Sequence, residues 1–181
     1  MTNNIPAGIS VLFDEATIAT RNAGLAAEIA AAGYSERLLV VAVLKGSFVF
    51  AADLIRALHE AHIAPEVDFI SLSSYRDGTT SSGTVTVLRD LETEVKGRSV
   101  LLVDDILESG RTLAYAKQLM IDRGAARTGV VVLLDKPKKR VASIEADFVG
   151  FETDPDTFVV GYGMDAAHAW RQLPFIGFKG E

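Results

Sequence analysis

The sequence predicts an α/β fold with a mostly parallel, doubly wound sheet, and three observations lead to this prediction. Continuous aliphatic runs, typical of strands buried on both faces, recur along the chain. Amphipathic stretches with helical spacing lie between these runs, and short polar segments separate the two kinds of element. Strands that alternate with helices form right-handed crossovers, which place neighbouring strands parallel.

The first half of the chain shows this alternation directly. A helix is predicted from Asp14, a capping residue, to about Ala32, where Gly33 ends the apolar stripe. The run LLVVAVL at 38–44 is typical of a strand covered on both faces. After a short polar interruption, residues 48–61 are again predicted to be helical.

The later elements repeat the pattern after one exception. Two strand-like stretches between Val67 and Val87 flank a centre rich in Ser, Thr and Gly, which is too long for a tight turn and predicts a loop. The elements that follow are strands at 99–103 and 128–134 around a helix at 113–124, and then strands at 147–152 and 158–163.

Length and composition narrow the class of protein. A chain of 181 residues is the size of one domain, so residues 1–181 are predicted to form a single domain. The absence of cysteine excludes thiolate nucleophiles, iron–sulfur centres and disulfides. A net charge of -6 gives no basic footprint for nucleic acid or anionic membrane. No targeting signal or membrane-spanning run is visible, so we expect a cytoplasmic protein without nucleic-acid or membrane partners.

The richest polar segment is DDILESGRT at 104–112, which follows the strand at 99–103. Ligands of open α/β sheets bind beyond the carboxyl ends of the strands. Two adjacent carboxylates there need hydroxyls or a cation for compensation, whereas the residues after Glu108 offer N–H groups and hydroxyls to a phosphate. A sugar phosphate has the complementary pattern. Taken in isolation, an acid pair favours an ordinary solvated connection between strand and helix.

The segment resembles a known signature. It is not a GxxxxGK[ST] loop, and no GxGxxG follows a strand. Together with its strand it resembles the phosphoribosyl-pyrophosphate signature of type I phosphoribosyltransferases, and the rest of the chain resembles the hypoxanthine/guanine branch of that family. The other residues that carry the resemblance are Leu44 to Ser47, Ser74 and Tyr75, Gly78 to Gly83, Lys136, Phe158 to Asp165, and Arg171.

The resemblance implies a fold, a reaction and partners. The fold is the type I phosphoribosyltransferase sheet with a small hood built from the chain ends. The reaction is purine salvage, the transfer of 5-phosphoribose from its 1-pyrophosphate to hypoxanthine or guanine, which releases pyrophosphate. The family implies Mg²⁺, two ions in the active complex, and a homodimer or homotetramer.

The resemblance also implies roles for individual residues on the sugar side. Asp104 and Asp105 would hold the ribose hydroxyls and one Mg²⁺. The residues that would wrap the 5-phosphate are Glu108, Ser109, Gly110, Arg111 and Thr112. Lys45 and Gly46, after a Leu44–Lys45 peptide bond that is often cis in the family, would bind pyrophosphate together with Arg171.

On the purine side, the resemblance implies four residues. Lys136 would donate to the 6-oxo oxygen, while Lys138 and Lys139 of the same basic run are interpreted as solvated. Phe158 would stack on the ring, although a single Phe is also typical of a core. Val159 and Asp165 would meet the ring edge through their backbone, and Asp165 would also take part in binding the second Mg²⁺.

The sequence departs from the common family pattern. Asp104 stands where many relatives have Glu, and Ser47 where a second Gly is frequent. Glu108 occupies the position of an Asp thought to accept the purine N7 proton, so Glu108 is the candidate general base. Ser74 and Tyr75 would begin a lid that keeps water from the cationic sugar. Two alternatives stay open: a nucleotide-binding regulator on the same fold, and a transferase for another base such as xanthine.

Overall fold

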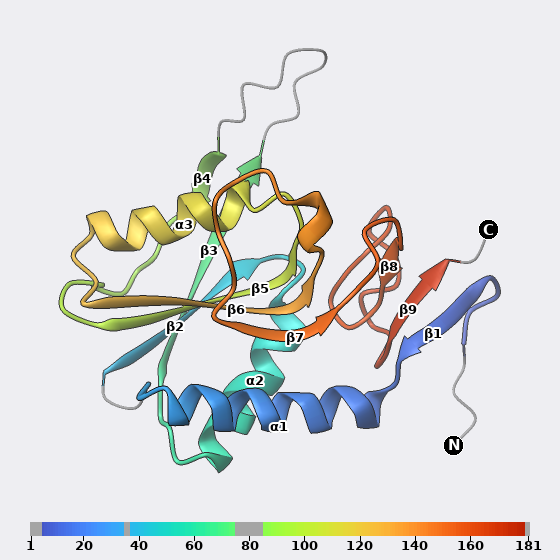
Figure 1. Ribbon diagram of the computed structural model, residues 1–181, viewed down its shortest axis with the longest axis horizontal. Coiled ribbons are helices and arrows are strands. Elements are labelled where there is room, and N and C mark those ends of the chain that lie inside the picture. The colour runs from blue at the N-terminus through green and yellow to red at the C-terminus, as the bar shows by residue number, and fades with distance from the viewer. Residues whose placement is uncertain (1–4, 35–36, 75–84, 180–181) are drawn as a thin grey trace.

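The main sheet has six strands and matches the predicted fold class (Figure 1). The computed structural model describes residues 5–34, 37–74 and 85–179. Neighbouring strands are parallel, except that β4 runs antiparallel to β3. The strands are, in spatial order, β4 (Val85–Arg89), β3 (Glu66–Ser74), β2 (Leu38–Leu44), β5 (Ser99–Leu107), β6 (Arg127–Asp135) and β7 (Phe148–Glu152).

Three helices cover the two faces of this sheet. In Figure 1, α1 (Glu15–Ala31) and α2 (Phe48–Glu60) lie on one face, and α3 (Arg111–Asp122) lies on the other. Strand β2 shows why its sequence is continuously apolar: alternate residues point to opposite faces, and both faces are covered. Leu38, Val40 and Ala42 pack in the core beneath α1 and α2. The intervening residues of β2 pack in the second core beneath α3.

The predicted start of α1 is confirmed by its cap. Asp14 Oδ1 accepts a hydrogen bond of 2.8 Å from the Thr17 N–H, and the helix ends at Ala31, just before Gly33. Gly33 has a φ of +80°, a conformation that glycine adopts without strain. No helix among the described residues is both long enough and apolar enough to cross a membrane.

Two predicted strand boundaries were wrong. Strand β5 continues to Leu107 rather than ending at Val103, because its ladder with β6 persists through Ile106 and the buried Leu107. The acid pair therefore lies inside the strand and not in a loop. The strand predicted at 158–163 is reduced to β8 (Val159–Val160), because positive φ angles follow it at residues 161–163.

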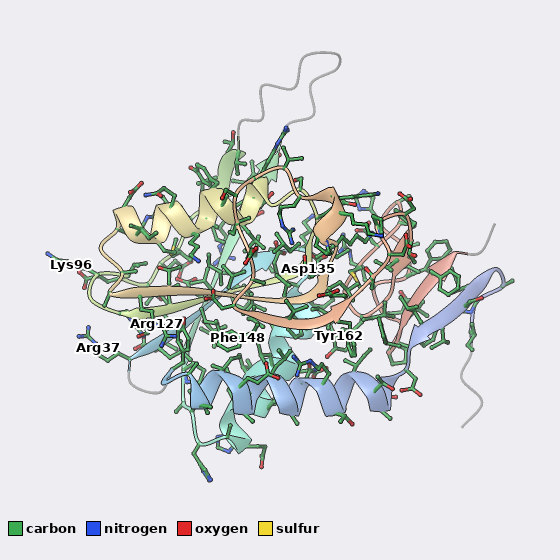
Figure 2. The ribbon with its side chains drawn as sticks, viewed as in Figure 1. Arg37, Lys96, Arg127, Asp135, Phe148 and Tyr162 are labelled. Atoms are coloured by element: carbon green, nitrogen blue, oxygen red, sulfur yellow. The ribbon has the colours of Figure 1, made fainter. Side chains whose placement is uncertain are left out.

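A separate sheet of three antiparallel strands forms the hood expected from the chain ends. Its order is β1 (Ile9–Phe13), β9 (Ile176–Lys179) and β8 (Figure 1). Tyr162, just after β8, anchors the hood to the helices (Figure 2). Its hydroxyl donates to Asp53 Oδ2 of α2 at 2.6 Å and accepts from Asn22 Nδ2 of α1 at 2.9 Å. This contact fixes the hood over the carboxyl ends of the strands.

Asp68 of β3 ties the connection between β4 and β5 to the sheet. Its Oδ2 accepts hydrogen bonds of 2.8 Å from the N–H groups of Glu92 and Thr93, and its Oδ1 accepts one of 2.7 Å from Phe69. Burial acts to raise the pKa of Asp68, but the three N–H donors outweigh it and hold the pKa below its ordinary value. The ionised carboxylate therefore stabilises the fold.

We expect Asp68→Asn to lower the free energy of unfolding at pH 7 by about 1 to 3 kcal/mol, because an amide nitrogen or a neutral oxygen replaces a charged acceptor. The contribution of Asp68 is fully present above the unfolded-state pKa of about 3.9 and is lost as pH falls through the lower folded-state pKa. The difference between variant and parent should therefore shrink in acid. Urea unfolding at several pH values measures it. Asp122→Asn, at an exposed site on α3, is the control and should match the parent at every pH.

Candidate active site

A cleft of about 260 Å³ lies at the carboxyl ends of β2 and β5. It brings together residues that the sequence predicted from two separate segments, 45–46 and 104–112. Apolar side chains that the sequence did not single out, such as Leu72 and Leu113, complete the wall. The predicted residues that line the cleft are Lys45, Gly46, Asp104, Asp105, Glu108, Ser109, Gly110 and Thr112.

Two glycines allow the parts of the site to approach closely. A Cβ on Gly46 would overlap the Asp105 carboxylate and lie 2.5 Å from its Cγ. A Cβ on Gly163, whose φ is +100°, would overlap the carbonyl oxygen of Gly46. The end of β2, the end of β5 and the hood therefore meet at Gly46. The Leu44–Lys45 peptide bond beside it is cis, as the resemblance implies.

The acid pair is largely removed from water. Asp104 is buried, and its Oδ1 accepts the Asp105 N–H at 3.0 Å, while Asp105 Oδ1 accepts the Ile106 N–H at 2.8 Å. Burial raises the pKa of Asp104, and the negative charge of Asp105 raises it further. Burial also raises the pKa of Asp105, and the positive charge of Arg171 partly offsets this rise. Such a pair favours a ligand that brings hydroxyl donors or a cation.

Arg171 and Asp165 form one unit beneath the hood. Arg171 Nη1 donates to the Gly163 carbonyl at 2.6 Å, and Nη2 lies 2.5 Å from Asp165 Oδ1. Asp165 Oδ2 accepts the His168 N–H at 2.7 Å. Because Gly163 lies against Gly46, this unit adjoins the end of β2, where the sequence predicted pyrophosphate binding.

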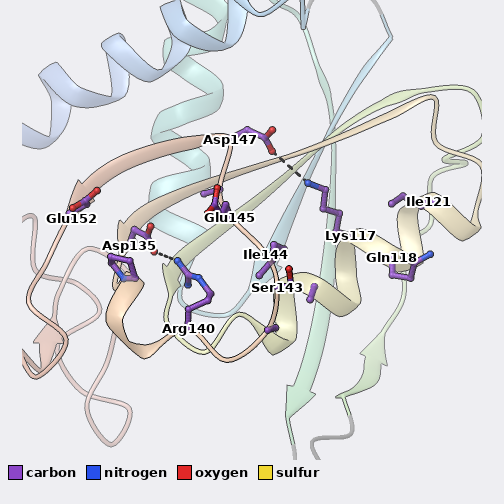
Figure 3. Close-up of a pocket in the computed structure, with 14 residues that line it drawn as sticks. Lys117, Gln118, Ile121, Asp135, Arg140, Ser143, Ile144, Glu145, Asp147 and Glu152 are labelled. Atoms are coloured by element: carbon purple, nitrogen blue, oxygen red, sulfur yellow. Dashed lines mark hydrogen bonds and ion pairs between the residues drawn. The ribbon is translucent and has the colours of Figure 1, made fainter.

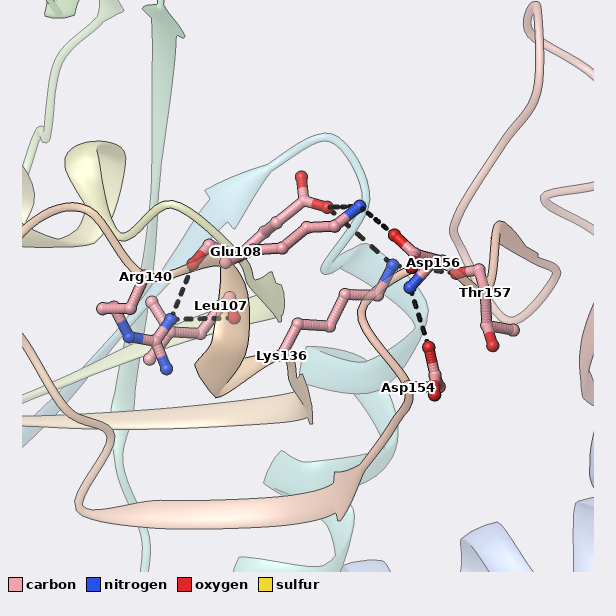
Figure 4. A network of polar contacts seen from close by, with 8 residues as sticks. Leu107, Glu108, Lys136, Arg140, Asp154, Asp156 and Thr157 are labelled. Carbon is pink, nitrogen blue, oxygen red and sulfur yellow. Dashed lines mark hydrogen bonds and ion pairs between the residues drawn. The ribbon is translucent and has the colours of Figure 1, made fainter.

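Lys136 lies between Glu108 of the cleft and the segment before β8 (Figure 4). Its Nζ donates to the Thr157 carbonyl at 2.8 Å and lies 3.9 Å from Glu108 Oε1. Lys136 is only 5% exposed, and burial lowers its pKa, which the charge of Glu108 opposes. The neighbouring Phe158 is 57% exposed, so it is not a core aromatic, whereas Val159 is buried.

Eight predicted residues are not among those that line the cleft. Five of them, Lys136, Phe158, Val159, Asp165 and Arg171, have the contacts and exposure given above, and the other three lie elsewhere or outside the described residues. Arg111 is exposed at the start of α3 and is not among the residues that line the cleft. Ser74 is the last residue of β3, and its side chain, like the whole of Tyr75, lies outside the described residues. The lid therefore stays a prediction.

Sequence reasoning missed part of the basic run. Lys139 is exposed, as its interpretation as solvated implies, although its Nζ lies 3.6 Å from Glu108 Oε1. Arg140 is mostly buried and contacts the backbone of residues 107 and 108, and nothing in the sequence distinguishes it from its neighbours. Side-chain direction after Pro137 decides these roles, and composition does not reveal it.

Comparison with known proteins places this arrangement in a family. A family model described as "Phosphoribosyl transferase domain" matches residues 9–167, which is most of the chain. The chain belongs to the phosphoribosyltransferase family. This phosphoribosyltransferase is 46% identical, over 92% of its length and 91% of the relative's, to the Bacillus subtilis (strain 168) protein named hypoxanthine-guanine phosphoribosyltransferase.

Solved structures with the same fold include two hypoxanthine phosphoribosyltransferases. The Staphylococcus aureus protein has a TM-score of 0.88 and 39% identity over 94% of this phosphoribosyltransferase and 91% of that chain. The Trypanosoma cruzi protein, in complex with the product IMP, has a TM-score of 0.87 and 37% identity over 98% and 97% of the two chains.

We expect Gly46→Ala to lower kcat/KM for phosphoribosyl transfer by about 100-fold, because the new methyl group must displace Asp105 or the backbone that follows β2. Steady-state kinetics with purified protein measures this. Gly24→Ala in α1 is the matched control, because its Cβ would meet only the flexible end of Arg21 at 3.1 Å. Equal activity of both variants would show that close packing at Gly46 does not matter to the reaction.

Proposed function

We propose that this phosphoribosyltransferase acts in purine salvage and moves the 5-phosphoribosyl group from phosphoribosyl pyrophosphate to a ring nitrogen of hypoxanthine or guanine. The C1–O bond breaks and its electron pair leaves with pyrophosphate, while the purine N9 forms the new bond to C1 and the proton on N7 passes to a general base. The products are IMP or GMP and pyrophosphate. The observation that carries the proposal is the buried pair Asp104 and Asp105, which shares one cleft with Lys45, Gly46 and residues 108–110.

The acid pair suits the ribose. A vicinal diol supplies two hydroxyl donors to carboxylate acceptors that are otherwise short of donors. Among the described residues, the side-chain oxygens of Asp104 and Asp105 accept only the N–H groups of the residues that follow them, so each carboxylate keeps lone pairs for a ligand. We assign to the pair the 2- and 3-hydroxyls, and to residues 108–112 the 5-phosphate.

The donor set also fits magnesium, which the family implies. No three Asp, Glu, His or Cys residues cluster for a metal within the described parts of the chain, and Mg²⁺ typically takes one or two carboxylates together with substrate phosphates and water. Asp104 and Asp105 would hold one ion. Asp165 would contribute to a second through its remaining lone pairs, since each of its oxygens already accepts one hydrogen bond. When bound, Mg²⁺ neutralises negative charge on the departing pyrophosphate.

Positive and dipolar groups of the chain face the leaving group. Lys45 and the backbone of Gly46 line the cleft, and Arg171 is held beside them through the Gly163 carbonyl. Fixed donors of this kind stabilise charge that grows as the C1–O bond breaks. We assign Lys45, Gly46 and Arg171 to pyrophosphate.

The purine base would bind between Glu108 of the cleft and the start of β8. Lys136 uses one of its three ammonium donors on Thr157, so two remain for the 6-oxo oxygen of a purine. Adenine carries an amino donor there and would be disfavoured. Phe158 offers an exposed ring face for stacking, and the backbone at Val159 and Asp165 would meet the ring edge.

Glu108 is the proposed general base for the purine N7 proton. Its side chain is 41% exposed and lies 3.9 Å from Lys136 Nζ, so it stands next to the proposed purine site with room to move. The lid at Ser74 and Tyr75 belongs to the proposal as the element that excludes water from the cationic sugar. Family membership further supports a homodimer or homotetramer and a cytoplasmic location.

A panel of bases tests the function directly. The protein is incubated with phosphoribosyl pyrophosphate and Mg²⁺ plus hypoxanthine, guanine, xanthine, adenine or uracil, and nucleotide formation is followed by chromatography. We expect IMP and GMP to form at least about ten-fold faster than AMP, because a lysine donor favours a 6-oxo acceptor. Product only from xanthine or uracil would show that the enzyme is a phosphoribosyltransferase for another base. No product from any base would favour a nucleotide-binding regulator.

We expect Glu108→Gln to lower kcat with hypoxanthine by about 100-fold or more, because glutamine cannot accept the N7 proton. The KM for phosphoribosyl pyrophosphate should stay close to that of the parent, since the amide keeps the size of the side chain. Glu145→Gln, outside the cleft lining, is the control. A kcat within a few-fold of the parent would exclude Glu108 as the base.

A further inference from the structure

Arg140 contacts the back of the loop that is proposed to bind the 5-phosphate. We call residues 108–110 the phosphate loop. Arg140 Nη1 donates to the carbonyls of Leu107 and Glu108, both at 2.9 Å (Figure 4). The N–H groups of Val141 and Ala142 both donate to the Ser109 carbonyl at 3.0 Å. Three successive carbonyls are therefore held by one short segment.

This contact decides where the loop's donors point. In a planar trans peptide the N–H points opposite to the carbonyl of the preceding residue, and the only cis bond among the described residues is Leu44–Lys45. Arg140 holds the carbonyls of residues 107 and 108, and the backbone of residues 141 and 142 holds the carbonyl of residue 109. The N–H groups of residues 108–110 are therefore turned the other way. Within the described structure, none of these three N–H groups donates to another backbone carbonyl. They are the donors that a phosphate would use.

Packing and charge make Arg140 a rigid support. A Cβ on Gly110 would lie 3.0 Å from Arg140 Cδ and 2.6 Å from Ile144 Cγ2, so residues 140–144 press on the loop. Arg140 Nη2 pairs with Asp135, the last residue of β6, and both side chains are at most 15% exposed. Asp135 lies opposite Leu107 in the ladder between β5 and β6, so its pairing with Arg140 fixes the position of the phosphate loop relative to the sheet.

The outer side of Arg140 faces a second hollow, of about 960 Å³, between α3 and residues 137–147 (Figure 3). Figure 3 shows Arg140 and Asp135 paired at its edge. Because Asp135 neutralises the guanidinium, Arg140 does not act by attracting substrate from solution. Its effect is geometric, through the planar fork of donors that a lysine ammonium cannot reproduce.

We propose that Arg140 is a positioning residue for phosphoribosyl binding, which acts by orienting the backbone of the phosphate loop. The proposal rests on the proposed function, because the loop must bind a phosphoribosyl group for its orientation to matter. Arg140 touches no reacting atom. The expected signature is a defect specific to the phosphoribosyl substrate, with the purine affected less.

The test compares Arg140→Ala and Arg140→Lys with the parent and with Arg123→Ala. Arg123 is the matched control because its guanidinium also pairs with one carboxylate, Asp90, at 2.7 and 2.8 Å, away from the cleft. We expect Arg140→Ala to raise the KM for phosphoribosyl pyrophosphate at least about ten-fold and the KM for hypoxanthine less than three-fold. Arg140→Lys should share the defect, and Arg123→Ala should match the parent.

Chemical rescue separates positioning from a general loss of structure. Added guanidinium at low millimolar concentration should restore part of the phosphoribosyl affinity of Arg140→Ala and should leave the parent and Arg140→Lys unchanged. If Arg140→Ala does not fold, the test rests on Arg140→Lys, through the increase in its KM for phosphoribosyl pyrophosphate compared with the increase in its KM for hypoxanthine. A KM for phosphoribosyl pyrophosphate within three-fold of the parent, or equal increases for both substrates, would overturn the proposal. Inactivity of the parent would instead refute the proposed function.

Discussion

The structure is organised around two carboxylates held out of water at the end of β5. The ladder with β6 continues past Asp104 and Asp105 to Leu107, so the strand itself carries the charges into the interior. Asp105 can lie there only because Gly46 has no side chain, and the hood can approach Gly46 only because Gly163 has none. Burial raises the pKa of both acids, so keeping the two carboxylates ionised side by side is electrostatically unfavourable. A ligand with a diol and a cation relieves that penalty, and its binding therefore stabilises the folded protein.

The regular part of the fold could be predicted because its local signals agree with its packing. The side chains of β2 point alternately into two cores, which is why its sequence is continuously apolar, and Asp14 caps α1 as its residue type suggests. The end of β5 could not be located, because polar residues commonly mark the end of a strand, whereas here the ladder continues through them for function. The short length of β8 depends on backbone angles around Gly161 that no hydrophobic pattern reveals.

The candidate site was predictable where one segment carried several signals together. The nine residues at 104–112 and the Lys45–Gly46 step are of this kind, and the structure places them around one cleft, with Arg111 as the exception. Single residues were ambiguous until their exposure was known: Phe158 could have been a core residue, and Lys136 could have been as solvated as the rest of its basic run. Arg140 could not be found at all, because two of its partners are backbone carbonyls, which every residue has, and no sequence pattern marks Asp135 as its carboxylate partner.

Under the proposed function, the segment from Lys136 to Arg140 acts on both parts of the substrate pair, the purine and the phosphoribosyl group. At one end Lys136 reaches toward the proposed purine site, and four residues later Arg140 grips the back of the phosphate loop. Only Pro137, Lys138 and Lys139, wound into a single 3-10 turn, separate them. Purine recognition and phosphoribosyl binding would therefore depend on the same turn, and an insertion or deletion within it would disturb both. Evolution or engineering of a new base preference has to proceed by exchanging side chains here while the length of the turn is kept.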